Sequence, residues 1–371
     1  MKRFLKFLKR MFLILISLIA LFVLAVVLFL QFAPQIGEKP KGEDLERISQ
    51  SPHWKDGKFV NIIPTKMAGF SDVISTMGEY FNAINTAPKD SLETYFGANK
   101  EAIDSLTYIT WYGHSAFLFE MDGKKILIDP MLGDYAAPLS FGSKRYPYKK
   151  AIPIDELKDI DAVLLSHDHY DHLDYPTIQK IKGEVKHWYT ALGLGSHLKS
   201  WGIAADAITE LDWWQESQLE EFRLVACPSR HFSGRSLVGQ SSTQWASWYI
   251  MSANRKIYFS GDGGYGPHFK EIEARYGAPD FAMLECGQYN KAWSDIHMMP
   301  EQSVKAGHDM KAKLIMPIHW GAFTLAMHEW TDPIERFKAE AVNLDMEMIH
   351  PMIGERFALE KDRPLTEWWK Q

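Results

Sequence analysis

The chain has 371 residues, of which 46% are apolar and 13% aromatic, so it can bury a large core and is not a disordered protein. Its formal net charge of -6 provides no general basic surface, and nucleic acid is therefore not an expected partner. The only cysteines, Cys227 and Cys286, are too few for a disulfide framework. Two thiols in the core are favoured over a bridge between them.

The N-terminal region carries the signature of a membrane anchor. Residues 11–30 are apolar except for Ser17, and 20 helical residues are long enough to cross a hydrocarbon core of about 30 Å. Five basic residues precede this stretch, whereas charges of both signs follow it. The positive-inside rule then predicts a single-pass protein with a cytoplasmic N-terminus and an extracytoplasmic body, either periplasmic or extracellular. A cleaved signal peptide is the alternative, although its apolar region is usually only about 7–15 residues long.

We expect three segments along the chain. Residues 1–33 form the basic tip and the transmembrane anchor, and residues 34–58, rich in Pro, Gly and charge, form a stalk. Residues 59–371 form the folded domain.

Short strands and helices interleave from Thr107 onward, which predicts an α/β (or α+β) domain with layered sheets. The stretch 59–105 before it is expected to be helical and irregular. The predicted strands are 107–111, 116–120, 125–129, 161–166, 222–226, 245–252, 256–260, 281–284 and 314–318. The predicted helices are 176–182, 268–276, 300–309 and 333–341.

The most informative motif is Ser166 to Asp174, which reads SHDHYDHLD directly after an apolar run. It places four potential metal ligands at the end of a predicted buried strand: His167, His169, Asp171 and His172. Imidazole and carboxylate groups suit Zn²⁺ or a similar divalent ion. Four ligands in this arrangement fit two ions better than one.

Three more ligands are expected just past other strands: His231, Asp262 and His319. Each alone is more typical of a structural residue, but together with the motif they complete two ligand sets. The first set is His167, His169 and His231; the second is Asp171, His172 and His319; Asp262 bridges the two ions. Gly261, Gly263 and Gly264 allow the close backbone approach that such a loop needs, although an ordinary tight turn would use them too.

The His167–His172 pattern, HxHxDH, resembles the hallmark of metallo-β-lactamase-fold hydrolases. Within them the chain is most similar to N-acyl-phosphatidylethanolamine-hydrolysing phospholipase D and its bacterial relatives. The likeness spans roughly residues 105–355 and is carried by segments 110–130, 138–148, 161–178, 259–266 and 317–326. It implies a four-layer αββα sandwich with the metals at one edge, and it supports the positions of His231, Asp262 and His319.

The resemblance implies a dinuclear hydrolase, a phosphodiesterase that uses a metal-bound hydroxide on a membrane phospholipid. The apolar stretch 11–30, outside the resemblance, adds the expected membrane anchor. A lactonase with the same two ions is the alternative enzyme, and β-lactam hydrolysis is less favoured because Asp262 stands where those enzymes have cysteine. A non-catalytic membrane-bound scaffold of the same fold is the alternative from another class. The oligomeric state stays open, a homodimer included.

Several other residues have two interpretations. Asp262 and His297 are the expected catalytic residues, His297 contacting a phosphate or giving a proton to the leaving group, although a structural role is equally expected for it. Asp129 either orients a metal-bound histidine or caps a turn. His114 belongs to the family motif GHS without an assigned role. Paired tryptophans at 213–214 and 368–369 favour buried packing over a lipid interface, and Met298 and Met299 fit either helix packing or an acyl-chain groove.

Overall fold

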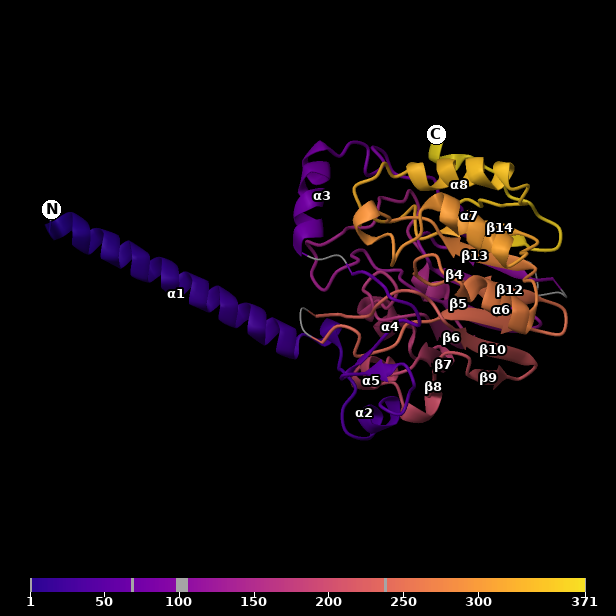
Figure 1. Cartoon of the computed structure of the whole chain (residues 1–371), viewed down its shortest axis with the longest axis horizontal. Helices are drawn as coiled ribbons and strands as arrows, with labels where there is room; N and C mark the ends of the chain where they lie inside the picture. The colour runs from indigo at the N-terminus through magenta and orange to yellow at the C-terminus, as the bar shows by residue number, and fades with distance from the viewer. Residues whose placement is uncertain (1, 68–69, 98–105, 237–238, 371) are drawn as a thin grey trace.

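The computed structural model describes residues 2–67, 70–97, 106–236 and 239–370. Two β-sheets form the centre of the molecule (Figure 1). The seven-stranded sheet has the order β15-β3-β4-β5-β6-β7-β8. Its strands are β3 Tyr108–Trp111, β4 Phe117–Met121, β5 Lys124–Ile128, β6 Ile160–Leu165, β7 Val185–Ala191, β8 Ile208–Leu211 and β15 Arg356–Ala358.

The six-stranded sheet has the order β14-β13-β12-β11-β10-β9. Its strands are β9 Glu216–Leu219, β10 Phe222–Cys227, β11 Ser247–Met251, β12 Lys256–Phe259, β13 Phe281–Glu285 and β14 Ile315–Ile318. Strands β12, β13 and β14 are parallel, as are β5 to β8 in the other sheet. Because parallel strands end at the same edge, residues that follow them can meet there.

Helices cover the outer faces of both sheets, which gives the predicted αββα sandwich. Helices α6 (His268–Tyr276), α7 (Pro300–Asp309) and α8 (Asp332–Asn343) belong to the six-stranded sheet, with α7 against β13 and α8 against β14. Helices α4 (Tyr175–Ile181) and α5 (Gly195–Ser200) belong to the seven-stranded sheet.

The core lies between the two sheets. Phe117 of β4 and Phe259 of β12 are fully buried, and their ring centroids are 6.4 Å apart in an edge-on contact between the sheets. The alternating apolar residues of each strand supply the rest of this interface, so the hydrophobic pattern of the strands fixes which faces meet.

The N-terminal helix α1 (Lys2–Phe32) projects from the body, and none of its residues is buried (Figure 1). It includes the whole apolar stretch 11–30 and is long and apolar enough to cross a membrane. Its apolar side chains lie exposed along the helix, which a bilayer would cover.

The segment expected to be a stalk packs against the body instead of extending from it. It contains η1 (Pro34–Ile36), α2 (Glu43–Ile48) and the short hairpin of β1 (Trp54–Lys55) and β2 (Lys58–Phe59). Ile48 is buried in the main core and Trp54 packs against that core, and the Trp201 indole donates to the Pro34 carbonyl over 2.7 Å. Its charged residues give it the composition of a linker, but these two apolar side chains attach it to the domain.

In the stretch 59–105, helix α3 (Phe70–Asn82) is followed by irregular chain up to Gly97, and residues 98–105 lie outside the described part.

Candidate metal centre

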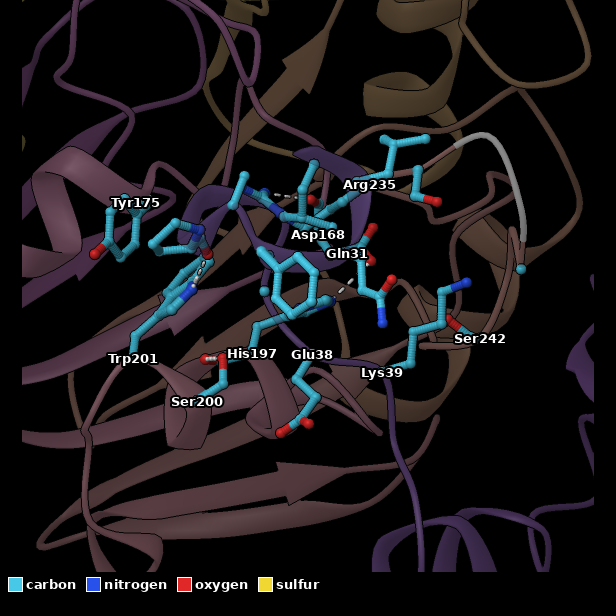
Figure 2. A pocket seen from close by; sticks show the side chains of 18 of the residues that line it. Gln31, Glu38, Lys39, Asp168, Tyr175, His197, Ser200, Trp201, Arg235 and Ser242 are labelled. Atoms are coloured by element: carbon cyan, nitrogen blue, oxygen red, sulfur yellow. Dashed lines mark hydrogen bonds and ion pairs between the residues drawn. The ribbon is translucent and has the colours of Figure 1, made fainter. Parts of the chain in front are cut away.

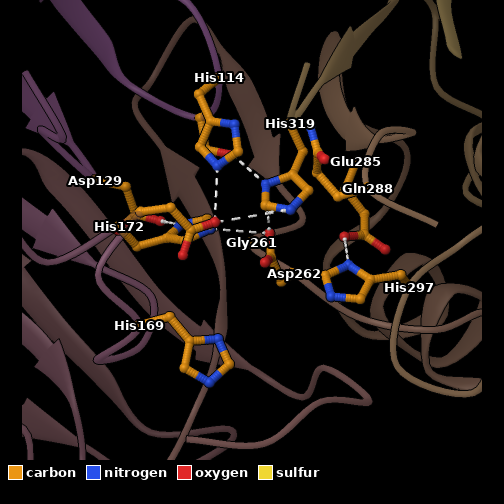
Figure 3. Close-up of polar contacts among 12 residues, drawn as sticks. His114, Asp129, His169, His172, Gly261, Asp262, Glu285, Gln288, His297 and His319 are labelled. Atoms are coloured by element: carbon orange, nitrogen blue, oxygen red, sulfur yellow. Dashed lines mark hydrogen bonds and ion pairs between the residues drawn. The ribbon is translucent and has the colours of Figure 1, made fainter. Parts of the chain in front are cut away.

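All seven predicted ligands come together at one edge of the sandwich, where strands of both sheets end. Figure 3 shows four of them, His169, His172, Asp262 and His319, with the residues around them. His167 and His169 follow β6, His231 follows β10, Asp262 follows β12 and His319 follows β14. His114 and Asp129 reach the same place from the ends of β3 and β5. The topology of the strands therefore builds the site.

The motif loop turns into helix α4 directly after its last ligand. Asp174 caps the helix, since its side chain accepts from the Thr177 amide over 3.0 Å, and Pro176 occupies the first turn, where no amide donor is needed. This start signal fixes where the loop ends, and so holds Asp171 and His172 at the sheet edge.

The first cluster consists of His167, His169, His231 and Asp262, whose nearest ligand atoms lie within 4.8 Å of one another. Nδ1 of His169 is 3.0 Å from Nε2 of His167 and 3.2 Å from Nε2 of His231. Nδ1 of His231 donates to the Ile296 carbonyl over 2.8 Å, which turns its Nε2 toward the other two rings.

The second cluster brings Asp171, His172 and His319 together with His114. Oδ2 of Asp171 lies 3.5 Å from Nε2 of His172 and 3.9 Å from Nε2 of His319. The same oxygen accepts a hydrogen bond of 2.8 Å from Nε2 of His114.

Asp262 lies between the two clusters and gives one oxygen to each. Oδ2 is 3.8 Å from Nε2 of His167 and 3.9 Å from Nε2 of His231. Oδ1 is 3.1 Å from Nε2 of His172 and 3.1 Å from Nδ1 of His319. Among the described residues, Oδ1 of Asp262 and Nε2 of His172 are buried and have no hydrogen-bond partner. Buried polar atoms of this kind need a partner, and a divalent cation fits these nitrogen and oxygen donors.

Two further side chains form hydrogen bonds to the predicted ligands and so hold them in place. Asp129 accepts from Nδ1 of His172 over 2.7 Å and from the Ser166 amide over 2.7 Å, and the first contact agrees with the orienting role, one of its two predicted roles. His114 has a site role that the sequence did not assign. Its backbone pairs with His319 and Trp320, so a bridge between the two sheets places its ring beside Asp171.

Glu285 is the second site residue that the sequence analysis missed. It ends β13, is fully buried, and its Oε2 lies 2.9 Å from Nδ1 of His297 while Oε1 accepts from the Met298 amide over 2.6 Å. The sequence offered one sign of this role, namely a carboxyl group at the end of a strand predicted to be buried. The contact explains how His297 is held at the rim of the second cluster.

The electrostatics of the site favour neutral imidazoles, the form that binds metal. Burial lowers the pKa of His169 to about 4 and the pKa values of His167, His231 and His319 well below their ordinary value. Burial acts in the same direction on His172, but Asp262, Asp171 and Asp129 outweigh it and raise its pKa. Without a cation, His172 is thus the group that balances the buried carboxylates.

Three residues of the site have unusual backbone conformations. His114, Asp129 and His319 have φ angles of 55°, 39° and 67°, in the left-handed region that residues other than glycine rarely adopt. The predicted close approach of the glycine loop is also present: a Cβ on Gly264 would lie 2.0 Å from the Asp295 carbonyl oxygen. This strain is stored where the ligands converge.

A cavity of about 230 Å³ opens onto the clusters. His169, Asp171, Asp262, His297 and His319 form its polar floor, and its wall is mainly apolar, with Phe232, Trp293, Ile296 and Leu325.

A larger cavity, of about 1250 Å³, lies elsewhere, at the root of α1, where Asp168, His197 and Arg235 approach one another (Figure 2). None of the seven predicted ligands lines it, so size alone does not mark the site.

Burial decides between the interpretations of several remaining residues, but not for Met299, which is half-buried. Cys227 and Cys286 are buried free thiols, as predicted. Trp213, Trp368, Trp369 and Met298 are buried, and Trp214 stacks on Tyr276. These side chains therefore serve packing.

The sequence profile of the Beta-lactamase superfamily domain matches residues 124–320, just over half of the chain. The chain belongs to this superfamily of metallo-β-lactamase-fold hydrolases. An uncharacterised protein of Mycobacterium tuberculosis is 37% identical over 334 residues, covering 86% of this chain and 88% of that protein. N-acyl-phosphatidylethanolamine-hydrolyzing phospholipase D 1 of Caenorhabditis elegans is 32% identical over 250 residues, covering 63% of this chain and 70% of that protein.

Solved structures agree on the fold of this superfamily member. A metallo-hydrolase from Ignicoccus hospitalis has a TM-score of 0.53 at 21% identity and covers 68% of this chain and 97% of its own. An isothiocyanate hydrolase from Delia radicum gut bacteria has a TM-score of 0.54 at 20% identity, covering 68% and 98%. At this distance the likeness extends to the fold alone.

Proposed function

We propose that this metallo-β-lactamase-fold hydrolase binds two divalent ions, Zn²⁺ being the expected metal, and cleaves a phosphodiester of a membrane phospholipid of the N-acyl-phosphatidylethanolamine type. The observation that carries the proposal is the position of Asp262, whose two oxygens face two separate histidine clusters. The phospholipase D of C. elegans supports the substrate class.

His167, His169 and His231 would hold the first ion; Asp171, His172 and His319 the second; and Asp262 would bridge them. Two ions at such a centre supply a water molecule with a lowered pKa and neutralise the charge that develops on a phosphate. Asp129, through His172, and the Ile296 carbonyl, through His231, fix the orientation of the ligand rings.

His297 is proposed to contact the phosphate or the leaving oxygen through a hydrogen bond donated by its Nε2. Burial raises the pKa of Glu285 well above its ordinary range, which favours the protonated carboxyl group. Its hydroxyl then donates to Nδ1 of His297, because Oε2 and Nδ1 are 2.9 Å apart. The hydrogen of the neutral imidazole is thereby placed on Nε2, the nitrogen left for the substrate.

The cavity suits a lipid headgroup with an attached apolar chain. Its acidic and imidazole floor takes the phosphodiester once cations are bound, and Phe232, Trp293 and Ile296 line the way out. The apolar wall also limits the water that reaches the reacting group.

Helix α1 is proposed to anchor the enzyme in the membrane with its N-terminus in the cytoplasm and its catalytic domain outside. The length and composition of α1 and the basic residues at its start support this orientation. A reporter enzyme fused to the C-terminus and active only outside the cytoplasm is the expected result. Activity only inside would reverse the orientation.

The substrate is tested with the full chain in phosphatidylcholine vesicles that contain N-acyl-phosphatidylethanolamine, beside a simple acyl lactone. We expect release of phosphatidic acid and N-acylethanolamine, abolished in His319→Gln and retained in His187→Gln, a control on β7 whose ring contacts Thr209. Turnover of the lactone alone would assign the lactonase activity. Turnover of neither by metal-loaded protein would indicate a scaffold.

A further inference from the structure

Helix α3 carries an apolar stripe that nothing in the described chain covers. The stripe consists of Ile74, Met77, Tyr80 and Phe81 on the helix and Ile84 just after its end, all of them exposed, and Phe81 is 77% exposed. Positions 74, 77 and 81 fall on one face of a helix because they are three and four residues apart. Burial in the core therefore does not explain these side chains.

The opposite face of α3 is polar and holds the helix to the body. Glu79 accepts a hydrogen bond of 2.6 Å from the Asn290 side chain, and Asp72 forms an ion pair of 2.9 Å with Lys66. The Lys66 amide in turn donates to Asp295 over 2.8 Å. The stripe thus points away from the domain.

These hydrogen bonds and the ion pair connect α3 to the wall of the candidate metal centre. Asn290 begins the segment that contains η4 (Lys291–Trp293), and η4 contacts α3. Trp293 and Ile296, a few residues further, line the cavity over the ligand clusters. Whatever covers α3 therefore lies beside the opening of the cavity.

The position of α3 relative to the anchor indicates that the lipid bilayer covers the stripe. In Figure 1, α3 lies at the end of the body from which α1 leaves and runs across the direction of α1. A helix so placed can lie along the surface of a bilayer that α1 crosses. A second exposed aromatic is near the root of α1: the Gln35 side chain donates to the Pro138 carbonyl over 2.9 Å, and Phe141 of the same loop is 83% exposed.

We propose that α3 is an interfacial helix that inserts the stripe into the outer surface of the bilayer crossed by α1. This inference rests on the proposed membrane anchoring and deepens it, because it gives the catalytic domain a fixed orientation on the membrane. Its apolar face takes acyl chains while Asp72 and Glu79 stay on the protein side. The cavity rim at Trp293 then faces the lipid layer, and a phospholipid substrate reaches the metal centre without crossing bulk water.

The insertion is tested with an environment-sensitive fluorophore on single added cysteines of the full chain, since both native cysteines are buried. The positions are Phe81→Cys, Leu21→Cys in α1, and Val342→Cys, an exposed apolar control on α8. The protein is reconstituted in phosphatidylethanolamine and phosphatidylglycerol vesicles with brominated acyl chains. We expect the lipid to quench the labels at 21 and 81 but not the label at 342.

Each other outcome identifies a different failure. Quenching at 21 without quenching at 81 would overturn the interfacial role of α3 and leave the anchor intact. If the fluorophore at position 81 emitted as it does in apolar surroundings but the brominated lipid did not quench it, a second copy of the chain would cover the stripe. Absence of quenching at 21 would overturn the anchor and the inference with it.

A kinetic test links insertion to catalysis. Phe81→Asp removes an apolar side chain that the bilayer would bury, so turnover of vesicle-borne lipid is expected to fall by about tenfold or more. Turnover of a short-chain, water-soluble phosphodiester is expected to stay at the wild-type rate, and Val342→Asp is expected to change neither. Equal loss on both substrates, or no loss on vesicles, would contradict the inference.

Discussion

Nε2 of His114 donates a hydrogen bond of 2.8 Å to Oδ2 of Asp171, and the histidine ring is completely buried. Burial lowers the pKa of His114 to about 4, so the ring stays neutral and its single hydrogen is committed to the carboxylate. The oxygen of Asp171 that accepts this hydrogen bond is also the one that faces His172 and His319. His114 therefore acts through Asp171 and is a positioning residue of the second cluster.

Replacing His114 by Ala is expected to lower turnover and the affinity for one of two ions by about 10- to 100-fold, the usual effect of losing a supporting partner of a metal ligand. The measurement is metal content after dialysis at graded free metal, together with kcat on vesicles. His187→Ala serves as the control. Unchanged metal affinity in His114→Ala would show that Asp171 needs no support.

Glu285 gives a prediction that depends on its protonation. A glutamine at this position can donate to Nδ1 of His297 and still accept from the Met298 amide, as protonated Glu285 does. Glu285→Gln should therefore retain kcat within about threefold, whereas Glu285→Met should lose about 100-fold, with metal content unchanged in both. If Glu285→Gln were as impaired as Glu285→Met, the carboxyl group would act in its ionised form.

Gly264→Ala tests the close approach of the glycine loop. The added Cβ would lie 2.0 Å from the Asp295 carbonyl oxygen, so the backbone around Asp262 must shift. We expect a loss of about 1–3 kcal/mol in the free energy of unfolding, together with weaker metal binding. Gly183→Ala is the matched control because nothing lies within 4 Å of its added Cβ, and denaturant unfolding of both variants gives the comparison.

His268 predicts part of the acid sensitivity of the fold. Burial lowers its pKa to about 3, below the unfolded value of about 6.5, so the folded state binds fewer protons than the unfolded state. Its contribution to stability is complete above about pH 6.5 and decreases as the pH falls toward 3. At pH 5 the loss is about 2 kcal/mol.

The measurement is the free energy of unfolding of wild type and His268→Gln at pH 5 and pH 7.5. The variant should lose less stability than wild type between these two values, since glutamine does not titrate. Parallel losses would mean that His268 is protonated without penalty in the folded protein.

The strands that could be predicted from sequence are those with apolar residues on a buried face. β6 has six consecutive buried residues, and its prediction was confirmed to within a residue at each end. β9 (Glu216–Leu219) has only polar or half-buried positions, because it forms a sheet edge, and it was not predicted. β7 was missed as well, since Lys186 and His187 interrupt its apolar pattern. β7 and β9 are strands because they pair with neighbouring strands, and not because of their own hydrophobic pattern.

The same division holds for the site. The seven His and Asp residues could be found because each follows a strand whose end the sequence marks. The contacts of His114 with Asp171 and of Glu285 with His297 could not, because they depend on how the two sheets and the loops pack. The exposed stripe on α3 could not be predicted from the sequence either, because the sequence does not show whether other parts of the chain cover the apolar face of this helix.

The most direct test of the central claim is the metal content per chain of purified full-length protein, wild type against Asp262→Ala, by mass spectrometry of the bound metal. The position of Asp262 between the two clusters predicts two divalent ions in the wild type and one or none in the variant. A wild type with a single ion, unchanged in Asp262→Ala, would contradict the dinuclear site.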